Sequence, residues 1–443
     1  AGTVEPTSAA KTRRLDLVIL WGFLVSLALI RAGHIEERDP YWQIRAGAEN
    51  LAGVPLARPD TWTWSGMEGN WYPNSPLWNV FLALAYRAAG LWGFFLLSAV
   101  TISLLLMLVV VLGRRLGSRP LPGLLGLLVV FAAAFPMLNA RATLAVQVLL
   151  LLAVYIPLRL GDGTRMRSSK ALPVVLFAVA FGLSVLGNWI HLSFLALAPA
   201  LAVVWAVIWL LTPDLSPARR AALIATGGVG WIAGLTLSPY GIVTGLDRTR
   251  AVQEACQGLI TEWSSPFDAN MPRTFLFMLA IALVLAGGTG WWLYGRWRTG
   301  QPIRELAVLA LIGVPAALAG LLAARFIGVA LLTLAPLAAP ATTRVVDRLR
   351  ARLLVWPSSQ VLRTRLQDYT TGRFWRIVLT ATLVVLSPGT VFLAAQHAQP
   401  SESAILARLP AGCRLFSTPD LGGAAVLLRP DVLVWMDGRA DFF

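Results

Sequence analysis

The sequence predicts an all-α polytopic membrane protein with about 11 transmembrane helices. Hydrophobic residues make up 57% of the 443 residues and charged residues only 13%, and the mean hydropathy is +0.69. Apolar runs long enough to cross a bilayer recur along the whole chain, which excludes a soluble globular protein. These runs lie at 15–33, 91–113, 120–138, 144–158, 171–187, 192–212, 222–238, 274–295, 306–322, 327–341 and 377–396.

The charges give these spans a direction. With the tail 1–14 in the cytoplasm, and each charge near a span end assigned to the nearer side, the inner loops hold 23 Lys or Arg and 7 Asp or Glu. The outer segments hold 14 and 15. This asymmetry is typical of membrane proteins, whose cytoplasmic loops are basic. Arginine outnumbers lysine 35 to 2, which is typical of a G+C-rich bacterial genome. We therefore expect a bacterial plasma-membrane protein with its N-terminus in the cytoplasm and its C-terminus outside.

All three histidines and every acid cluster fall on the predicted extracytoplasmic side, so we expect any chemistry there. The inner loop 342–376 is instead rich in arginine, and we interpret it as a topology anchor at anionic lipid headgroups rather than a nucleic-acid site. The domain 15–396 thus carries two large outer segments, 34–90 and 239–273. Segment 397–443 contains two strand-like runs, Ala424–Leu428 and Val432–Trp435, around a Gly-Gly turn. We expect this segment to be the start of a small α/β extracytoplasmic domain that continues beyond Phe443.

The first outer segment begins with a cluster of acids, Glu36, Glu37 and Asp39. Crowded carboxylates at a low-dielectric boundary suit a general base or a cation site. A helix of amphipathic pattern follows over 40–52, and we expect it to lie on the membrane surface. Asp39 and Pro40 are also the residue types that begin a helix. The sequence leaves both roles open for Asp39.

Three basic residues, Arg141, His191 and Arg325, lie on short outer turns where separate spans reach the surface. Ionisable side chains at this depth usually face a cavity, and a guanidinium binds phosphate through two donors. Snorkelling to lipid headgroups is the alternative for each residue taken alone. Together they predict a shared anion site, which Arg45 could join.

Aromatic residues in the outer segments are candidates for stacking on sugar rings. Most tryptophans at a membrane boundary belong to the interfacial belt, which is the alternative interpretation. The candidates for the acceptor or sugar are Trp42, Trp62, Trp64, Tyr240, Glu262 and Trp263.

The run Asp39-Pro40-Tyr41-Trp42-Gln43 after the first span resembles the acidic first-loop motif of GT-C-type membrane glycosyltransferases. The chain resembles most closely a bacterial group of GT-C-like membrane proteins. Each matching piece is short, and the order of the pieces and their common outer location carry the resemblance. The pieces are Trp42…Arg45…Gly47, Gly53-Val54-Pro55 with Arg58-Pro59-Asp60, Arg141, Asn188…His191, Pro239-Tyr240-Gly241, Glu262-Trp263, Arg325-Phe326 and Asp437-Gly438-Arg439.

The resemblance implies an inverting transfer of sugar from a polyprenyl-phosphate donor to an extracytoplasmic glycan, lipid or protein. Asp39 would be the general base, and Glu36 or Glu37 offers the second acid that many members pair with it. Arg45, Arg141, His191 and Arg325 would bind the phosphate of the donor. A divalent cation is compatible with this site, with Glu36, Asp39 and His191 as candidate ligands. The expected partners are membrane lipids and the lipid-linked donor, and no nucleic acid.

Two other functions remain open. A catalytically silent GT-C-like scaffold would recruit proteins of a cell-envelope complex. A transporter of lipid-linked substrates would need broken spans and mid-membrane polar residues, and the spans here carry few central charges.

Overall fold

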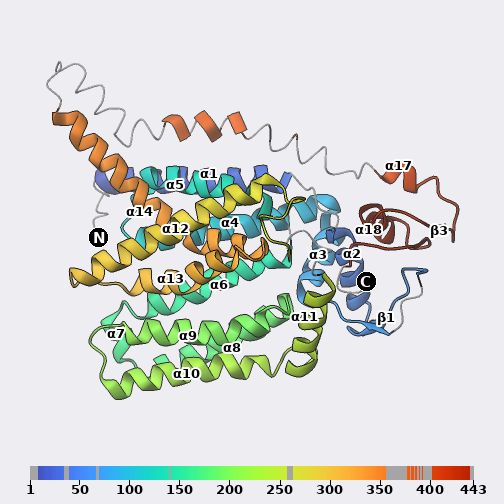
Figure 1. Cartoon of the computed structure of the whole chain (residues 1–443), viewed down its shortest axis with the longest axis horizontal. Coiled ribbons are helices and arrows are strands. Elements are labelled where there is room, and N and C mark those ends of the chain that lie inside the picture. The colour runs from blue at the N-terminus through green and yellow to red at the C-terminus, as the bar shows by residue number, and fades with distance from the viewer. Residues whose placement is uncertain are drawn as a thin grey trace, which may run out of the picture.

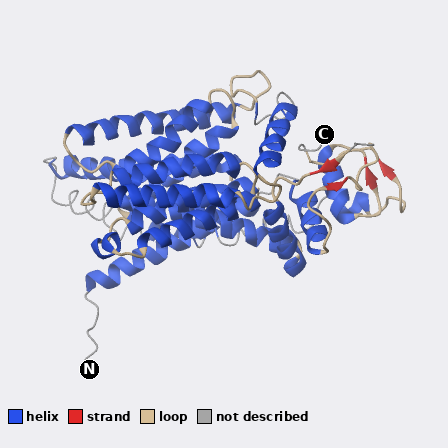
Figure 2. Ribbon diagram, turned by 90° about the horizontal axis from the view of Figure 1, so that it is seen from below, coloured by secondary structure: helices blue, strands red, loops and turns tan. Residues whose placement is uncertain are grey.

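The computed structural model describes residues 8–33, 39–65, 69–138, 141–256, 263–355 and 402–439, with short pieces between 377 and 392. These residues form a long helical bundle and a smaller cap at one end of it (Figure 1). The bundle contains α1 (Ser8–Gly33), α4 (Leu91–Arg115), α5 (Pro120–Ala134), η1 (Phe135–Met137), α6 (Ala142–Leu160), α7 (Thr164–Ser168), α8 (Leu172–Ile190), α9 (Phe194–Leu210), α10 (Pro217–Leu235), α12 (Arg273–Arg298), α13 (Arg304–Ala319) and α14 (Arg325–Val355). The cap contains α2 (Asp39–Leu51), β1 (Arg58–Pro59), β2 (Asn70–Trp71), α3 (Pro76–Ala89), α11 (Ile242–Cys256), α17 (Ser403–Leu406), β3 (Arg414–Leu415), α18 (Pro419–Leu428) and β4 (Leu433–Val434). Figure 2 shows that the strands lie in the cap.

The prediction of a helical polytopic membrane protein is confirmed. Each of the first ten predicted spans coincides with a helix of the bundle. Six helices in the described part of the chain are long and apolar enough to cross a membrane, namely Leu15–Gly33, Leu91–Arg115, Ala142–Leu160, Leu172–Ile190, Arg273–Arg298 and Arg325–Leu349. The predicted total of about 11 is not confirmed, because the others are shorter or less apolar and most of 377–396 lies outside the described residues.

The spans differ in how much of their surface neighbouring helices cover. In α14, 78% of the most apolar window is buried inside the protein, whereas in α12 only 28% is buried. Helix α14 therefore lies in the middle of the bundle, and α12 lies at an edge that faces lipid. Small residues permit the closest packing: a Cβ atom at Gly230 of α10 would lie 2.8 Å from the carbonyl oxygen of Phe177 in α8. Backbones approach in this way where membrane helices pack through glycine.

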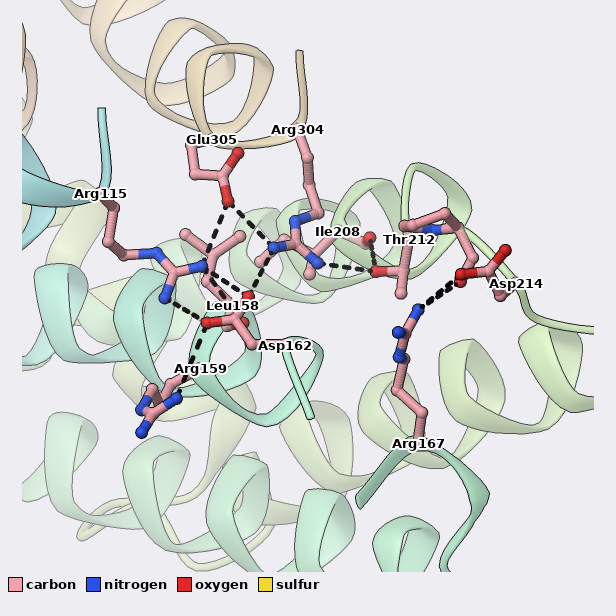
Figure 3. Close-up of polar contacts among 11 residues, drawn as sticks. Arg115, Leu158, Arg159, Asp162, Arg167, Ile208, Thr212, Asp214, Arg304 and Glu305 are labelled. Atoms are coloured by element: carbon pink, nitrogen blue, oxygen red, sulfur yellow. Dashed lines mark hydrogen bonds and ion pairs between the residues drawn. The ribbon is translucent and has the colours of Figure 1, made fainter. Parts of the chain in front are cut away.

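Ion pairs join the helix ends far from the cap (Figure 3). Asp162, just after α6, accepts from Arg115 of α4 at 2.6 Å and from Arg304 of α13 at 2.9 Å. Glu305 accepts from the same two arginines at 3.2 and 2.9 Å. Arg304 also donates to the Thr212 hydroxyl beyond α9 at 3.4 Å. Four helix ends are thus held together by charges that stay outside the apolar middle of the bundle.

Helix α2 confirms the helix predicted at 40–52, but its surroundings differ from the prediction. We expected one face to rest on the membrane surface, whereas α2 lies between α3 and α18, and seven of its thirteen residues are buried. Gly47 permits this packing, because a Cβ atom there would lie 1.9 Å from the backbone oxygen of Asn79 in α3. Leu51, the last residue of α2, is 47% accessible. Neighbouring elements of the protein thus bury more than half of the residues of this helix.

The predicted strand Ala424–Leu428 is wrong, because these residues form the second half of helix α18. A short apolar run fits a strand or a buried helix equally well, and Pro419 in the first turn favours the helix. The predicted Gly-Gly turn is also wrong. Gly422 lies inside α18, where a Cβ atom would be 1.9 Å from the backbone oxygen of Met436, so glycine lets the segment after β4 approach the helix. The small α/β character predicted for this segment is nevertheless present, since β3 pairs in parallel with β4.

The C-terminal segment is fastened to the first loop by a buried arginine. Arg439, only 1% exposed, binds Asp437 at 2.7 Å and Asp60 at 2.8 Å. Its guanidinium also lies over the rings of Trp62 and Trp71, 4.3 and 4.7 Å from their centroids. Burial alone would raise the pKa of Asp60, but the charge of Arg439 and hydrogen bonds from neighbouring groups outweigh it and lower that pKa. Residues 402–439 and the first loop therefore form one packed unit.

Replacing Arg439 by glutamine should detach this segment. The variant leaves two buried carboxylates without their cation, a change that typically costs about 3–5 kcal/mol. We expect R439Q to be cleaved within 402–439 by a protease that leaves the native chain intact. The exposed Arg408 supplies the matched control, R408Q, which should resist cleavage like the native protein. Equal resistance of R439Q and the native protein would contradict the role given to Arg439.

Candidate functional site

A cavity of about 710 Å³ lies where the bundle meets the cap. Its walls come from α6, α9 and α14 of the bundle and from α2, α11 and α18 of the cap. Charged and polar side chains gather on the cap side, and apolar side chains continue along the helices of the bundle. We therefore treat this cavity as the candidate active site.

The three basic residues predicted to share a site do line this one cavity. Arg141 immediately precedes α6, His191 follows the last residue of α8, and Arg325 begins α14. They meet because all three helix ends lie at the cap end of the bundle. Asp39, the first residue of α2, lines the same cavity.

Asp39 both begins a helix and faces the cavity. Its Oδ2 atom lies 3.1 Å from a guanidinium nitrogen of Arg141, and its Oδ1 accepts from the indole nitrogen of Trp42 at 3.4 Å. Gly438 of the C-terminal segment comes so close that a Cβ atom there would lie 2.7 Å from Oδ1. About 29% of the Asp39 side chain stays accessible. The two roles that the sequence left open for Asp39 are therefore compatible.

His191 is a neutral hydrogen-bond donor at this site. Burial and the charges of Arg325 and Arg141 lower its pKa from 6.5 to about 3, so the ring is uncharged near pH 7. Its Nδ1 atom accepts the backbone N–H of Ser193 at 3.0 Å. The proton of the neutral ring therefore sits on Nε2. His191 can donate to an anion between the two arginines without adding to their mutual repulsion.

Arg325 is held in place by Trp263. Its guanidinium carbon lies 3.8 Å from the centroid of the indole ring, and both side chains line the cavity. The backbone N–H of Ala324 donates to the carbonyl oxygen of Ser264 at 3.0 Å, which ties the loop to the start of α14. Trp263, predicted as a sugar contact, thus first serves as a platform for a cation.

The other part of the cavity is apolar. The cavity lining extends along α14 to Leu332, seven residues after Arg325, and along α6 to Leu150, nine residues after Arg141. These lengths correspond to about 10–13 Å along the two helices. A molecule with a charged head and an apolar tail matches this division. The apolar lining residues are Met137, Leu144, Val146, Leu150, Ala196, Leu197, Phe326, Val329 and Leu332.

Several lining residues were not predicted from the sequence. Gln43 and Gln147 are 5% and 8% exposed, and within the described part of the chain the Oε1 atom of each has no hydrogen-bond partner. Gln147 had a visible signal, since a lone amide within an apolar span is costly. Arg248, over the ring of Tyr72 at 4.2 Å, and Asp420 of α18 had none, because only the fold brings them to the cavity.

Two predicted phosphate or sugar contacts hold the cap together instead. Arg45 pairs with Glu49 at 3.0 Å and donates to the backbone oxygen of Val426 in α18 at 2.9 Å. Trp62 is 2% exposed and packs against Trp71, with ring centroids 5.2 Å apart. Neither residue lines the cavity. Both residues instead contact or pack beneath the C-terminal segment.

Trp64 and Tyr240 also lie outside the cavity lining. Trp64 packs on Trp435, with centroids 4.7 Å apart. Tyr240 donates to the backbone oxygen of Pro73 at 2.8 Å and packs edge-on against Tyr72, which itself lines the cavity. Both predicted ligand contacts are thus neighbours of the site rather than part of its wall.

The acids Glu36, Glu37 and Glu262 lie outside the described residues. Within the residues that are described, no group of three or more His, Cys, Asp or Glu side chains is arranged to hold a metal ion. Asp39 and His191 both line the cavity. The divalent cation therefore stays a prediction.

No protein-family model matches the chain, and no curated protein matches its sequence. Solved structures do resemble it. The oligosaccharyltransferase of Archaeoglobus fulgidus, tethered with an acceptor peptide containing the NVT sequon, aligns with a TM-score of 0.54 and 10% identity over 96% of this chain and 64% of that one. Its apo form gives the same values. ArnT from Cupriavidus metallidurans, bound to undecaprenyl phosphate, aligns with a TM-score of 0.50 and 14% identity over 97% of this chain and 86% of that one.

These similarities confirm the predicted fold. The chain has the fold of the GT-C membrane glycosyltransferases, built as a multi-pass helical membrane protein. It spans less than two thirds of the length of the oligosaccharyltransferase. At such low identity the similarity establishes the fold alone.

His191 is expected to make the stability of the folded protein depend on pH. The pKa of His191 is about 3 in the folded protein and 6.5 in the unfolded chain. As the pH falls from 6.5 toward 3, His191 therefore takes up a proton in the unfolded chain but stays neutral in the folded protein. Stability is therefore lost on acidification. At pH 5 the loss amounts to at most about 2 kcal/mol, since the ring lines a cavity. We expect H191N to lose less thermal stability than the native protein between pH 7 and pH 5. Equal losses in the two proteins would show that His191 does not titrate in this way.

Proposed function

We propose that the chain is a membrane glycosyltransferase that transfers a sugar from a polyprenyl-phosphate donor to a hydroxyl group of an extracytoplasmic glycan, lipid or protein with inversion. The observation that carries the proposal is the meeting of Asp39, Arg141, Arg325 and a neutral His191 in a cavity whose other part is apolar. We further propose, from the charge asymmetry of the loops, that this cavity faces the extracytoplasmic side of a bacterial plasma membrane.

The donor would bind according to the two halves of the cavity. Its apolar tail would lie along the lining of α6, α9 and α14, and its phosphate between Arg141, Arg325 and the Nε2–H of His191. The buried amide oxygens of Gln43 and Gln147 would accept from hydroxyl groups of the sugar. The structure of ArnT, which has the same fold, was solved bound to undecaprenyl phosphate, and this supports a lipid phosphate as the ligand here.

The transfer would be a single displacement. Asp39 takes the proton of the acceptor as the acceptor atom forms its bond to the anomeric carbon. The bond from that carbon to the phosphate oxygen breaks, and the electron pair leaves with the polyprenyl phosphate. Arg141 and Arg325 stabilise the negative charge that grows on the leaving phosphate. Asp39 and Arg141, 3.1 Å apart, place base and leaving-group cation side by side.

Asp39→Asn tests the catalytic step. We expect transfer from a polyprenyl-phosphate sugar to fall at least about 100-fold, the usual contribution of a general base. Binding of undecaprenyl phosphate should persist or tighten, because Arg141 is no longer shared with a carboxylate. The measurements are release of undecaprenyl phosphate from the loaded donor and direct binding of the lipid to the purified chain. Unchanged release in D39N would reject Asp39 as the base, and absence of release by the native chain with every donor would favour the scaffold.

Arg325→Gln tests the phosphate site independently of the sugar. We expect the variant to bind undecaprenyl phosphate at least about tenfold more weakly, because a charge-assisted hydrogen bond typically contributes about 1.5–3 kcal/mol. Arg87, exposed near the end of α3, gives a matched control, since R87Q removes the same charge from the same end of the protein. Binding that is weakened equally in both variants would point to general surface charge instead of this cavity.

A further inference from the structure

A second cluster of cations lies at the end of the bundle opposite the cavity. The three arginines are Arg296 of α12 and Arg344 and Arg348 of α14, and they lie around Trp292 of α12. We refer to these four residues as the Trp292 cluster. The guanidinium carbon of Arg344 lies 3.9 Å from the centroid of the Trp292 ring, and that of Arg296 lies 5.1 Å from the same centroid. One indole thus holds two guanidiniums from two different helices.

Within the described part of the chain, the charges of the Trp292 cluster are not balanced by nearby acids. The charges of Arg296 and Arg348 both act on Arg344. The neighbouring Asp347 is engaged elsewhere, since it pairs with Arg119 at 3.0 Å. Among the residues that the structure describes, no carboxylate lies within ion-pair distance of the three clustered arginines. Three like charges held together without a counter-charge favour the binding of an anion.

The cluster lies at a membrane boundary. Arg344 follows Arg325 by nineteen residues of α14, which corresponds to about 28 Å along a helix. The hydrocarbon core of a bilayer is about 30 Å thick, so the cluster reaches the boundary opposite the cavity.

The face that carries the cluster is open to lipid. Helix α12 is the least covered of the six long apolar helices. Its exposed aromatic residues Trp291, Tyr294 and Trp297 are 80%, 51% and 66% accessible, and they surround the end that carries Arg296. Exposed Trp and Tyr at such a boundary mark the level of lipid headgroups.

We propose that the Trp292 cluster binds the headgroup phosphate of an anionic phospholipid in the membrane leaflet opposite the cavity. A guanidinium grips phosphate oxygens through two parallel donors, and Arg344 and Arg296 are already oriented by the ring between them. Because the two arginines come from α12 and α14, a bound phosphate joins an edge helix to the central helix of the bundle. Bound lipid should therefore stabilise the fold. This site is separate from the proposed donor site and does not depend on it.

The test uses the purified full chain in a neutral detergent, to which phosphatidylglycerol or phosphatidylcholine is added. We expect phosphatidylglycerol to raise the midpoint of thermal unfolding, and phosphatidylcholine to raise it by less than half as much. The R344Q variant should lose at least half of the phosphatidylglycerol effect and bind that lipid about fivefold more weakly, since one basic residue contributes about 1 kcal/mol at an anionic surface. Arg344 is exposed, so R344Q should fold.

Further variants separate a built site from general charge. Lys170 is an exposed cation before α8 at the same end of the bundle, and K170Q should keep the full phosphatidylglycerol effect. R344K retains the charge but loses the flat stacking on Trp292, so it should lose part of the effect. W292L, which removes the shared ring, should lose at least as much as R344Q. An equal loss in K170Q and R344Q would overturn the proposal.

Glycerol phosphate and inorganic phosphate, added without lipid, distinguish a lipid from a soluble anion. We expect neither to reproduce the phosphatidylglycerol effect at the same concentration, because both lack the acyl chains that lie along α12. A full effect of inorganic phosphate would overturn the assignment to a lipid, and equal effects of the two phospholipids would overturn the assignment to an anion.

Discussion

A bilayer admits ionisable side chains only near its two surfaces, and this constraint organises the whole molecule. The long helices are apolar through their middles, so their charges collect at the helix ends. At the far end, Asp162 and Glu305 neutralise Arg115 and Arg304 and join the ends of α4, α6 and α13. At the cap end, Arg141 and Arg325 line the cavity, where Arg141 pairs with Asp39 and Arg325 lies over Trp263. The same electrostatic cost thus places both the ion pairs that join the helices and the charged wall of the candidate site at the helix ends.

The cavity also depends on contacts between distant parts of the chain. Gly438 closes against Asp39, and Pro419 and Asp420 complete the wall, so the last described segment shapes a site that begins at the first loop. That segment is held by Arg439, which is buried between two carboxylates and two indole rings. A buried ion pair contributes little net stability but fixes geometry, because its partners are costly to separate. The Arg439 cluster is therefore best understood as a positioning element for the cap.

The sequence predicts the bundle and the meeting of Arg141, His191 and Arg325, because hydropathy and chain direction suffice to place helix ends on one side. It does not predict the cap. Whether Trp62 is exposed depends on a segment more than three hundred residues away, and the run at Ala424 is too short for its periodicity to distinguish helix from strand. Gln147 could have been found, since an amide in an apolar span is a signal in itself. Asp420 could not, because nothing in its neighbourhood shows that α18 turns toward the cavity.

The pairing of Asp39 with Arg141 has a consequence for the order of events in the proposed reaction. Without a ligand, Arg141 neutralises Asp39 at 3.1 Å. A phosphate that arrives between Arg141 and Arg325 takes a share of the same guanidinium and places negative charge near the carboxylate. Both changes favour protonation of Asp39, so the carboxylate becomes a stronger base only after the donor has bound. Arg141 would thus link the two parts of the proposed reaction. Asp39 would remove the proton of the acceptor more readily when the donor phosphate is bound. In the proposed reaction, an arginine shared by the base and the donor phosphate would make donor binding favour activation of the acceptor.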